Sequence, residues 1–205
     1  LYFLENHDEQ RIASDFFCGS AMKAIPAAAM SLFFQKNPFM LYSGQEFGEK
    51  GMDKEGFSGR DGRTTIFDYW SPSTLAHAYQ DSADETLTAE QKYLAATYRQ
   101  LLRLANEEKA LREGDTFDLM YVNPGSEGFD PRTNFAFLRK KDNEVMLIVL
   151  NFAQEARQLQ VCIPGHAFDF FQITEEEVLV TELFSGGKKK RSEEHTSELQ
   201  SPVPI

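Results

Sequence analysis

Residues 3–11 read FLENHDEQR, and in this stretch a short apolar run gives way to charged and polar side chains. We interpret residues 1–6 as a strand that opens onto a polar loop. This places His7 and Asp8 at the C-terminal end of the strand, the end that carries the active site in parallel α/β barrels. A carboxylate there can stabilise a developing positive charge, and an imidazole can donate a hydrogen bond to a hydroxyl group. Taken alone, the pair also fits a structural interpretation, in which Asp8 is a cap and His7 is hydrogen-bonded within the loop.

The residues after this loop predict a helix and a second strand. Residues 14–36 are rich in Ala, Met, Leu and Phe and are apolar on most sides, which indicates a largely buried helix with Pro26 in an early turn or at a kink. The Asn-Pro pair at residues 37–38 stops this helix, and residues 39–42 form a continuous apolar strand. A strand, a helix and a strand in this order make a parallel unit.

A long polar segment and a second helix follow. Residues 47–86 are rich in Gly and Asp with scattered aromatic side chains, and their length predicts a functional loop rather than a plain connection. Thr88 and Gln91 have the spacing of a capping box, which marks the start of a helix. This helix ends near Gly114, and its apolar face carries Leu94, Tyr98, Leu101, Leu102 and Ala105.

Beyond Gly114 the apolar period changes to that of strands. The predicted strands are residues 116–122, 134–140, 145–152, 158–163 and 178–184. Asp142 and Asn143 are suited to a hairpin turn between two of them. Strands that follow an alternation of strands and helices indicate a separate antiparallel domain. We therefore place a domain boundary near Gly114.

The composition restricts the kind of partner. The chain has 32 acidic and 21 basic residues and a net charge of −11, which repels nucleic acid and anionic membranes and favours a neutral substrate. No apolar run reaches the roughly 18 residues of a membrane span. Cys18 and Cys162 lie far apart in apolar segments, so we expect two buried free thiols rather than a disulfide.

The two ends of the chain need their own interpretation. Residues 191–201 read RSEEHTSELQS and look like the translation of a common sequencing adapter. We therefore exclude residues 191–205 from the fold and expect them to be disordered; a natural polar tail is the alternative. Leu1 already lies inside a predicted strand, so an export signal would lie upstream and the compartment stays open.

Two motifs together resemble the alpha-amylase superfamily, glycoside hydrolase family 13. Residues 3–8 are similar to the Asn-His-Asp motif that ends the seventh barrel strand, and residues 37–48, NPFMLYSGQEFG, look like the eighth strand. The resemblance continues over about 190 residues. It implies the last two β/α units of a TIM (β/α)8 barrel in residues 1–113 and an all-β antiparallel sandwich domain in residues 114–190.

The resemblance also implies roles for individual residues. Asp8 matches the catalytic aspartate that stabilises the transition state, and His7 matches the substrate-binding histidine. Residues 59–64, GRDGRT, look like a loop in which Arg60 helps to hold a terminal sugar; the alternative is a salt bridge within the loop, with Asp61 or another carboxylate. Within this loop the resemblance ends at residue 64, because residues 65–70 depart from the usual family sequence.

Three aromatic side chains and one acidic side chain near these motifs have a structural role as an interpretation. Phe57, Tyr69 and Trp70 could stack on sugars or pack the loop onto the barrel. Glu46 ends the second strand, and we interpret it as structural.

The predicted activity belongs to a longer protein. A retaining glycosidase needs a nucleophile and a general acid, which in this family come from strands that lie upstream of Leu1. We therefore expect the full-length protein to hydrolyse α-glucosidic bonds of starch or maltooligosaccharides, and this fragment to be inactive. A transglycosylase or isomerase, or a non-catalytic binding member of the superfamily, is the alternative.

Two further expectations concern metals and stability. We expect no cofactor in this fragment, while calcium is possible in the full-length protein. A metal-dependent phosphohydrolase would need ligands beyond His7 and Asp8, and His77, His166 and His195 show no suitable arrangement. With only two of eight barrel strands, the chain should aggregate or fold only in its C-terminal part.

Overall fold

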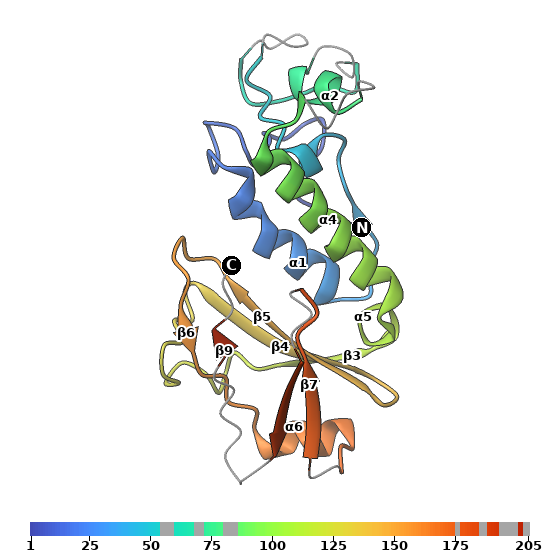
Figure 1. Ribbon diagram of the computed structural model, residues 1–205, viewed down its shortest axis with the longest axis vertical. Helices are drawn as coiled ribbons and strands as arrows, with labels where there is room; N and C mark the ends of the chain where they lie inside the picture. The colour runs from blue at the N-terminus through green and yellow to red at the C-terminus, as the bar shows by residue number, and fades with distance from the viewer. Residues whose placement is uncertain are drawn as a thin grey trace. The chain divides into compact units, whose positions relative to one another are not determined.

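The computed structural model describes residues 1–53, 60–67, 72–79, 86–174, 177–184, 188–192 and 201–202. The chain divides into two compact units, Leu1–Arg112 and Glu113–Ile205. Figure 1 shows helices in the first unit and most of the strands in the second. That the first unit is the end of a barrel and the second a sandwich domain stays a prediction.

The N-terminal unit contains the parallel unit that the sequence predicts. Strand β1 (Tyr2–Phe3) pairs in parallel with β2 (Phe39–Met40), and η1 (Ala21–Ala24) and α1 (Ile25–Phe33) connect them. The helical segment is shorter than predicted: residues 12–19 form turns, and Gly19 has the positive φ of 66° that a continuous helix does not permit. Pro26 lies in the first turn of α1, where a missing N–H costs no hydrogen bond.

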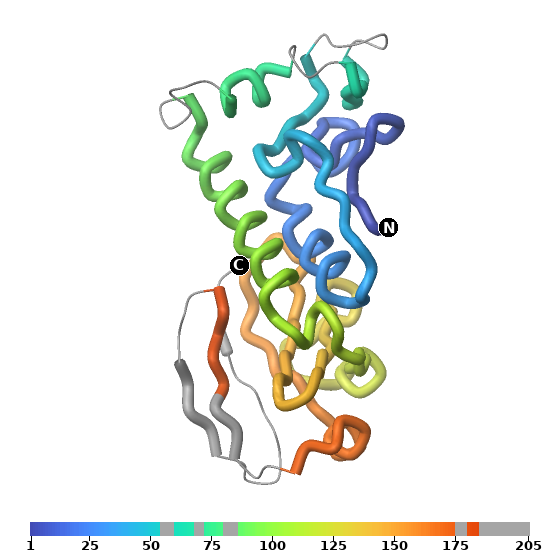
Figure 2. The backbone as a smooth tube through the Cα atoms, turned by 90° about the vertical axis from the view of Figure 1, so that its right-hand side faces the viewer, coloured from blue at the N-terminus to red at the C-terminus, as the bar shows by residue number. Residues whose placement is uncertain are grey.

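Helix α4 (Ala89–Glu107) is the longest element of this unit. Its capping box is confirmed, because the Thr88 hydroxyl accepts the Gln91 N–H and the Gln91 side chain accepts the Thr88 N–H. Leu94, Tyr98 and Leu101 are buried as predicted, but Leu104 completes the buried face in place of Leu102 and Ala105. This face packs against α1 and η2 (Gln45–Phe47), and Figure 2 shows α1 and α4 side by side.

Two further short helices are described before the strands of the second unit. Helix α2 (Ser73–Ala78) lies against η2 and buries Leu75. Helix α5 (Lys109–Glu113) follows α4 after Glu108, and it buries Ala110 and Leu111.

The C-terminal unit is built on an antiparallel sheet. Among the described residues it has three strands in the order β3-β4-β5: β3 (Asp115–Asp118), β4 (Asn134–Lys141) and β5 (Glu144–Asn151). Lys141 pairs with Glu144, so Asp142 and Asn143 form the predicted hairpin turn. Asp142 has a φ of 51°, which such a two-residue turn requires.

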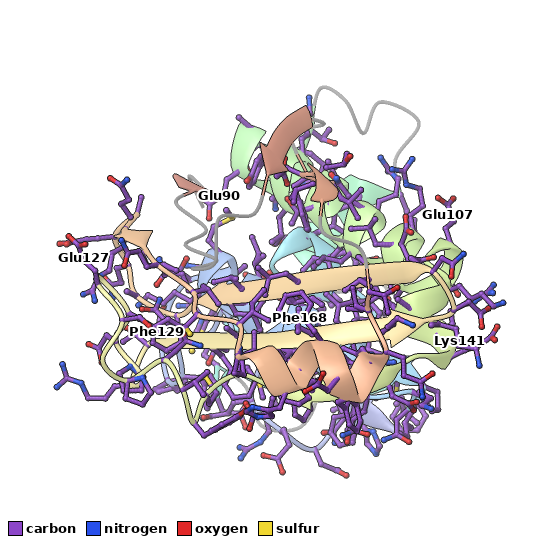
Figure 3. The ribbon with its side chains drawn as sticks, turned by 90° about the horizontal axis from the view of Figure 1, so that it is seen from below. Glu90, Glu107, Glu127, Phe129, Lys141 and Phe168 are labelled. Atoms are coloured by element: carbon purple, nitrogen blue, oxygen red, sulfur yellow. The ribbon has the colours of Figure 1, made fainter. Side chains whose placement is uncertain are left out.

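A helix that the sequence analysis did not predict covers one face of this sheet. Helix α6 (Gly165–Phe171), on which Figure 3 labels Phe168, lies next to β4 in that view and buries Ala167 and Phe171 in the core of this unit. The core between helix and sheet also holds Leu119, Phe129, Ala136, Leu138 and Val161. The described part of this unit therefore contains a helix beside its antiparallel strands, and its assignment to a sandwich domain stays a prediction.

The remaining strands are short pairs. Strand β6 (Gln158–Leu159) is shorter than predicted and pairs with β9 (Ser201–Pro202), and β7 (Glu177–Thr181) pairs with β8 (Lys188–Ser192). The described residues 191–192 and 201–202 belong to these pairs, and the expectation of disorder for residues 191–205 as a whole stays a prediction. That residues 191–205 come from an adapter stays a prediction.

Two smaller expectations can be compared with the structure. Within the described residues, no helix has the length and apolar character needed to cross a membrane. Cys18 and Cys162 are free, as expected, but Cys162 is exposed rather than buried and Cys18 is partly exposed. Cys162 follows the buried Val161 in extended chain, where successive side chains point to opposite sides.

Candidate functional site

A buried ion pair fixes the segment that follows β1. Arg11 donates from Nη1 to Oε2 of Glu5 at 2.8 Å, and the Ile12 N–H donates to Oε1 of Glu5 at 2.9 Å. Both charged side chains are almost fully buried. The chain between Glu5 and Arg11 is therefore held as a closed loop, and this loop carries His7 and Asp8.

Asn6 shapes the loop from inside. Its Oδ1 atom accepts the N–H groups of Asp8 and Glu9, both at 2.8 Å. Such an Asx turn directs the following side chains outward. The side chains of His7 and Asp8 are 52% and 76% exposed, and their Nε2 and Oδ2 atoms lie 3.5 Å apart. The structure therefore brings the two predicted site residues together, exposed, after the end of β1.

Arg11 also ties this loop to two other segments. Its Nη2 atom donates to the Ser43 carbonyl just after β2 at 2.7 Å, and its Nε atom donates to Thr64 Oγ1 at 2.9 Å. Its guanidinium lies 4.3 Å from the centre of the Tyr42 ring, a cation–π distance. Burial raises the pKa of Glu5, and the neighbouring Arg11 partly opposes that shift. One buried side chain thus joins both strand ends and the segment around residue 64.

Residues 61–64 lie against the loop that carries Asp8. The Gly62 carbonyl accepts the Arg11 N–H at 2.6 Å, and Gln10 donates to the Asp61 carbonyl at 3.1 Å. Gly62 has a φ of 82°, and a Cβ atom there would lie 2.8 Å from Ser14 Oγ. Glycine is therefore the residue that permits this close approach.

Arg63 is a site residue that the sequence analysis did not select. Its Nε atom donates to the Asp8 carbonyl at 3.0 Å, and its Nη1 atom lies 3.1 Å from Asp61 Oδ2. The alternative for Arg60 paired it with Asp61, but the described contacts show Asp61 with Arg63 instead. Arg60 is exposed, and the described residues show no hydrogen bond from it to His7 or Asp8.

The remaining expectations concern Glu46, three aromatic side chains and metal binding. Glu46 accepts the Gly44 N–H at 3.1 Å, a contact of the structural kind. Phe57, Tyr69 and Trp70 lie outside the described residues. No group of three or more His, Cys, Asp or Glu side chains that could hold a metal is found in the described part of the chain.

Comparison with known proteins assigns the chain to a family. No family model matches it. Over 163 residues, however, it is 32% identical to alpha-amylase SusG of Bacteroides thetaiotaomicron, and this match covers 76% of the chain and 23% of SusG. The chain belongs to the alpha-amylase superfamily. It spans about a quarter of this curated relative.

Solved structures show the same relationship at the level of the fold. A maltogenic alpha-amylase, AmyB of Thermotoga neapolitana, has a TM-score of 0.55 and 18% identity, over 97% of this chain and 38% of that one. Trehalulose synthase MutB of Pseudomonas mesoacidophila has a TM-score of 0.51 and 21% identity, over 97% and 41%. AmyP in complex with maltose has a TM-score of 0.57 and 17% identity, over 92% and 36%.

Proposed function

We propose that this member of the alpha-amylase superfamily is the C-terminal part of a retaining glycoside hydrolase that acts on α-glucosidic bonds of starch, maltooligosaccharides or related glucans. The observation that carries the proposal is the exposed pair of His7 and Asp8 after β1, held by buried contacts beside the parallel strand β2. The names of SusG and of the amylase structures support the choice of substrate.

The two exposed side chains suit different parts of the reaction. Cleavage of a glycosidic bond passes through an oxocarbenium-like state with positive charge at the anomeric carbon. The Asp8 carboxylate stabilises that charge, and the His7 imidazole donates a hydrogen bond to a sugar hydroxyl. Arg60 binds a sugar hydroxyl from the neighbouring loop. The nucleophile and the general acid belong to the rest of the full-length protein, as does any calcium site, so the present chain is inactive alone.

Transfer of the sugar is the second candidate. One of the structural neighbours is named a trehalulose synthase, which supports a reaction that forms a new glycosidic bond. The His7 and Asp8 pair serves both reactions, because hydrolysis and transfer pass through the same oxocarbenium-like transition state. Chromatography of the products formed by the full-length protein separates them.

The test uses the full-length gene recovered from its source DNA. The wild type and the Asp8→Asn and Asp8→Ala variants are assayed on starch and maltooligosaccharides. Loss of a charge that acts mainly in the transition state lowers kcat by about 10²- to 10³-fold or more. Asp15→Asn is the matched control. Asp15 lies between β1 and β2, as Asp8 does, and its carboxylate is exposed. Its ion pair with Lys50, at 3.8 Å, is exposed as well.

Each outcome has a definite meaning. A large loss in the Asp8 variants, with the fold intact and the Asp15 variant active, supports the proposal. Equal activity in all variants removes Asp8 from the mechanism. A full-length wild type that binds glucans but converts none favours a non-catalytic binding protein.

A further inference from the structure

A group of aromatic rings, exposed except for the partly buried Phe117, lies on the C-terminal unit, far in sequence from every residue of the proposed site. We call Phe117, Tyr121, His166 and Phe170 the aromatic surface. The centre of the Phe117 ring lies 5.5 Å from those of His166 and Phe170 and 6.3 Å from that of Tyr121. Tyr121 is 56% exposed and Phe170 57% exposed, and His166 is exposed as well. Large contiguous aromatic exposure of this kind marks a binding site more often than isolated apolar residues do.

The aromatic surface is held in place from below. Phe171 is buried in the core and lies 6.0 Å from Phe117 and 5.1 Å from Phe170 between ring centres. His166 and Phe170 are one turn apart on α6, so they share one side of that helix. The hydroxyl of Tyr121 is hydrogen-bonded to Nε2 of His166. A ligand therefore meets rings that are already ordered, which lowers the entropic cost of binding.

The chemistry of the surface restricts the ligand. The rings offer apolar faces, and the Tyr121 hydroxyl and the His166 imidazole offer polar atoms beside them. Asp169, exposed one helical turn from His166, adds a carboxylate that accepts hydrogen bonds. Residues 117–121 and 165–171 contain no Lys or Arg, so they do not attract an anionic partner. A neutral molecule with apolar faces and many hydroxyl groups, which is a sugar, matches this combination.

The size of the surface argues against a protein partner. A stable dimer buries about 800 Å² and about 20–30 residues on each partner. The four members of the aromatic surface are far fewer than that. We propose that the aromatic surface is a non-catalytic binding site for an α-glucan chain, in addition to the site at Asp8. The choice of an α-glucan rests on the proposed function.

The test measures binding by the 205-residue chain itself. Maltoheptaose is titrated into the chain by calorimetry, and soluble starch is used in affinity electrophoresis. Tyr121→Ala and Phe170→Ala each remove one stacking face and weaken the affinity by about tenfold. Tyr93→Ala is the matched control, because Tyr93 is a tyrosine of similar exposure, 57%, on α4 in the other unit. We expect the Tyr93→Ala variant to bind maltoheptaose with the affinity of the wild type.

Milder variants keep the test valid if an alanine variant does not fold. Tyr121→Phe keeps the ring and removes the hydroxyl bound to His166, so the affinity falls by about two- to fivefold. Phe170→Leu keeps apolar volume without an aromatic face, so it weakens binding as Phe170→Ala does. Circular dichroism of each variant confirms that the unit is folded.

Several results overturn the proposal. They are no binding of maltoheptaose at millimolar concentration, equal affinity in all variants, or a dimer in sedimentation that Phe170→Ala dissociates. Burial of these rings against the rest of the full-length protein also overturns it. The outcome is independent of catalysis, because binding is measured on the 205-residue chain and a full-length protein without glycosidase activity does not alter the binding result.

Discussion

The Nε atom of Arg63 donates a hydrogen bond to the backbone carbonyl of Asp8 at 3.0 Å, across 55 positions of sequence. The same guanidinium is paired with Asp61, so its orientation is set from two sides. The Asp8 side chain itself is 76% exposed. We infer that Arg63 positions the backbone of Asp8 without taking part in the reaction.

The first prediction tests this role in the full-length protein. Arg63→Gln keeps a polar side chain but loses the paired geometry, and a displacement of Asp8 of about 1 Å lowers kcat by up to about 10²-fold. The loss falls mainly on kcat rather than KM, because Asp8 acts mainly in the transition state. Arg63→Lys restores part of the activity through its ammonium donor. A rise in KM alone would instead make Arg63 a substrate ligand.

The second prediction concerns the buried pair of Glu5 and Arg11. Glu5→Leu leaves the Arg11 charge buried without its carboxylate, and breaking such a pair costs about 3–5 kcal/mol in the free energy of unfolding. The exposed pair of Arg103 and Glu107, one turn apart on α4, is the matched control. Glu107→Leu removes a carboxylate in the same way but costs less than about 1 kcal/mol. Urea unfolding followed by circular dichroism measures both values, and equal losses would show that burial does not govern these pairs.

The third prediction uses Tyr98, which is buried and accepts a hydrogen bond from Gln45 Nε2 at 2.9 Å. Burial raises the pKa of Tyr98 to about 12. Because this value lies above the ordinary value of about 10, the group's contribution to stability is complete below pH 10 and is lost as the pH rises through 12. The loss approaches about 3 kcal/mol, from a shift of about two pH units at about 1.4 kcal/mol each.

The comparison with Tyr98→Phe isolates this effect. At pH 7 the variant is less stable than the wild type by about 1–2 kcal/mol, because Gln45 loses a buried partner. Between pH 10 and 12 the difference shrinks, since phenylalanine has no proton to lose. Urea unfolding at several pH values measures it. A difference that stays constant over this range would contradict the assignment of the alkaline loss to Tyr98.

Local signals in the sequence predicted the elements whose geometry they determine. The Thr88 and Gln91 spacing marked the start of α4, and the Asp142 turn marked the β4 and β5 hairpin. Helix α6 was missed because it is short and follows Pro164 in a region of strand-like period. Its one signal is the four-residue spacing of Ala167 and Phe171, the two residues that face the core.

The part of the candidate site that lies within one sequence motif was predictable, and the contact made by a residue distant in sequence was not. His7 and Asp8 follow β1 as the motif indicates. The contact from Arg63 is made to a backbone carbonyl, which every residue has, so no residue pattern at Asp8 announces it. Arg60 belongs to the same motif, and only the path of residues 61–64 distinguishes the two arginines.

The last prediction contrasts two glycines of one turn in the C-terminal unit. Gly128 has a φ of 72°, and a Cβ atom there would clash with the Gln158 carbonyl oxygen. Backbone cannot move aside as the end of a side chain can, and the Glu127 carbonyl already accepts the Gln160 N–H at 2.8 Å in the same place. Gly128→Ala therefore lowers the free energy of unfolding by about 3 kcal/mol or more.

Gly125 supplies the control for that substitution. It lies three positions earlier, a Cβ atom there would meet nothing within 4 Å, and its φ is not positive. Gly125→Ala is therefore neutral or slightly stabilising, because alanine has fewer unfolded conformations to lose. Urea unfolding of the two variants side by side measures the contrast. Equal stability in both would mean that residues 125–128 and 158–160 do not pack as closely as these positions require.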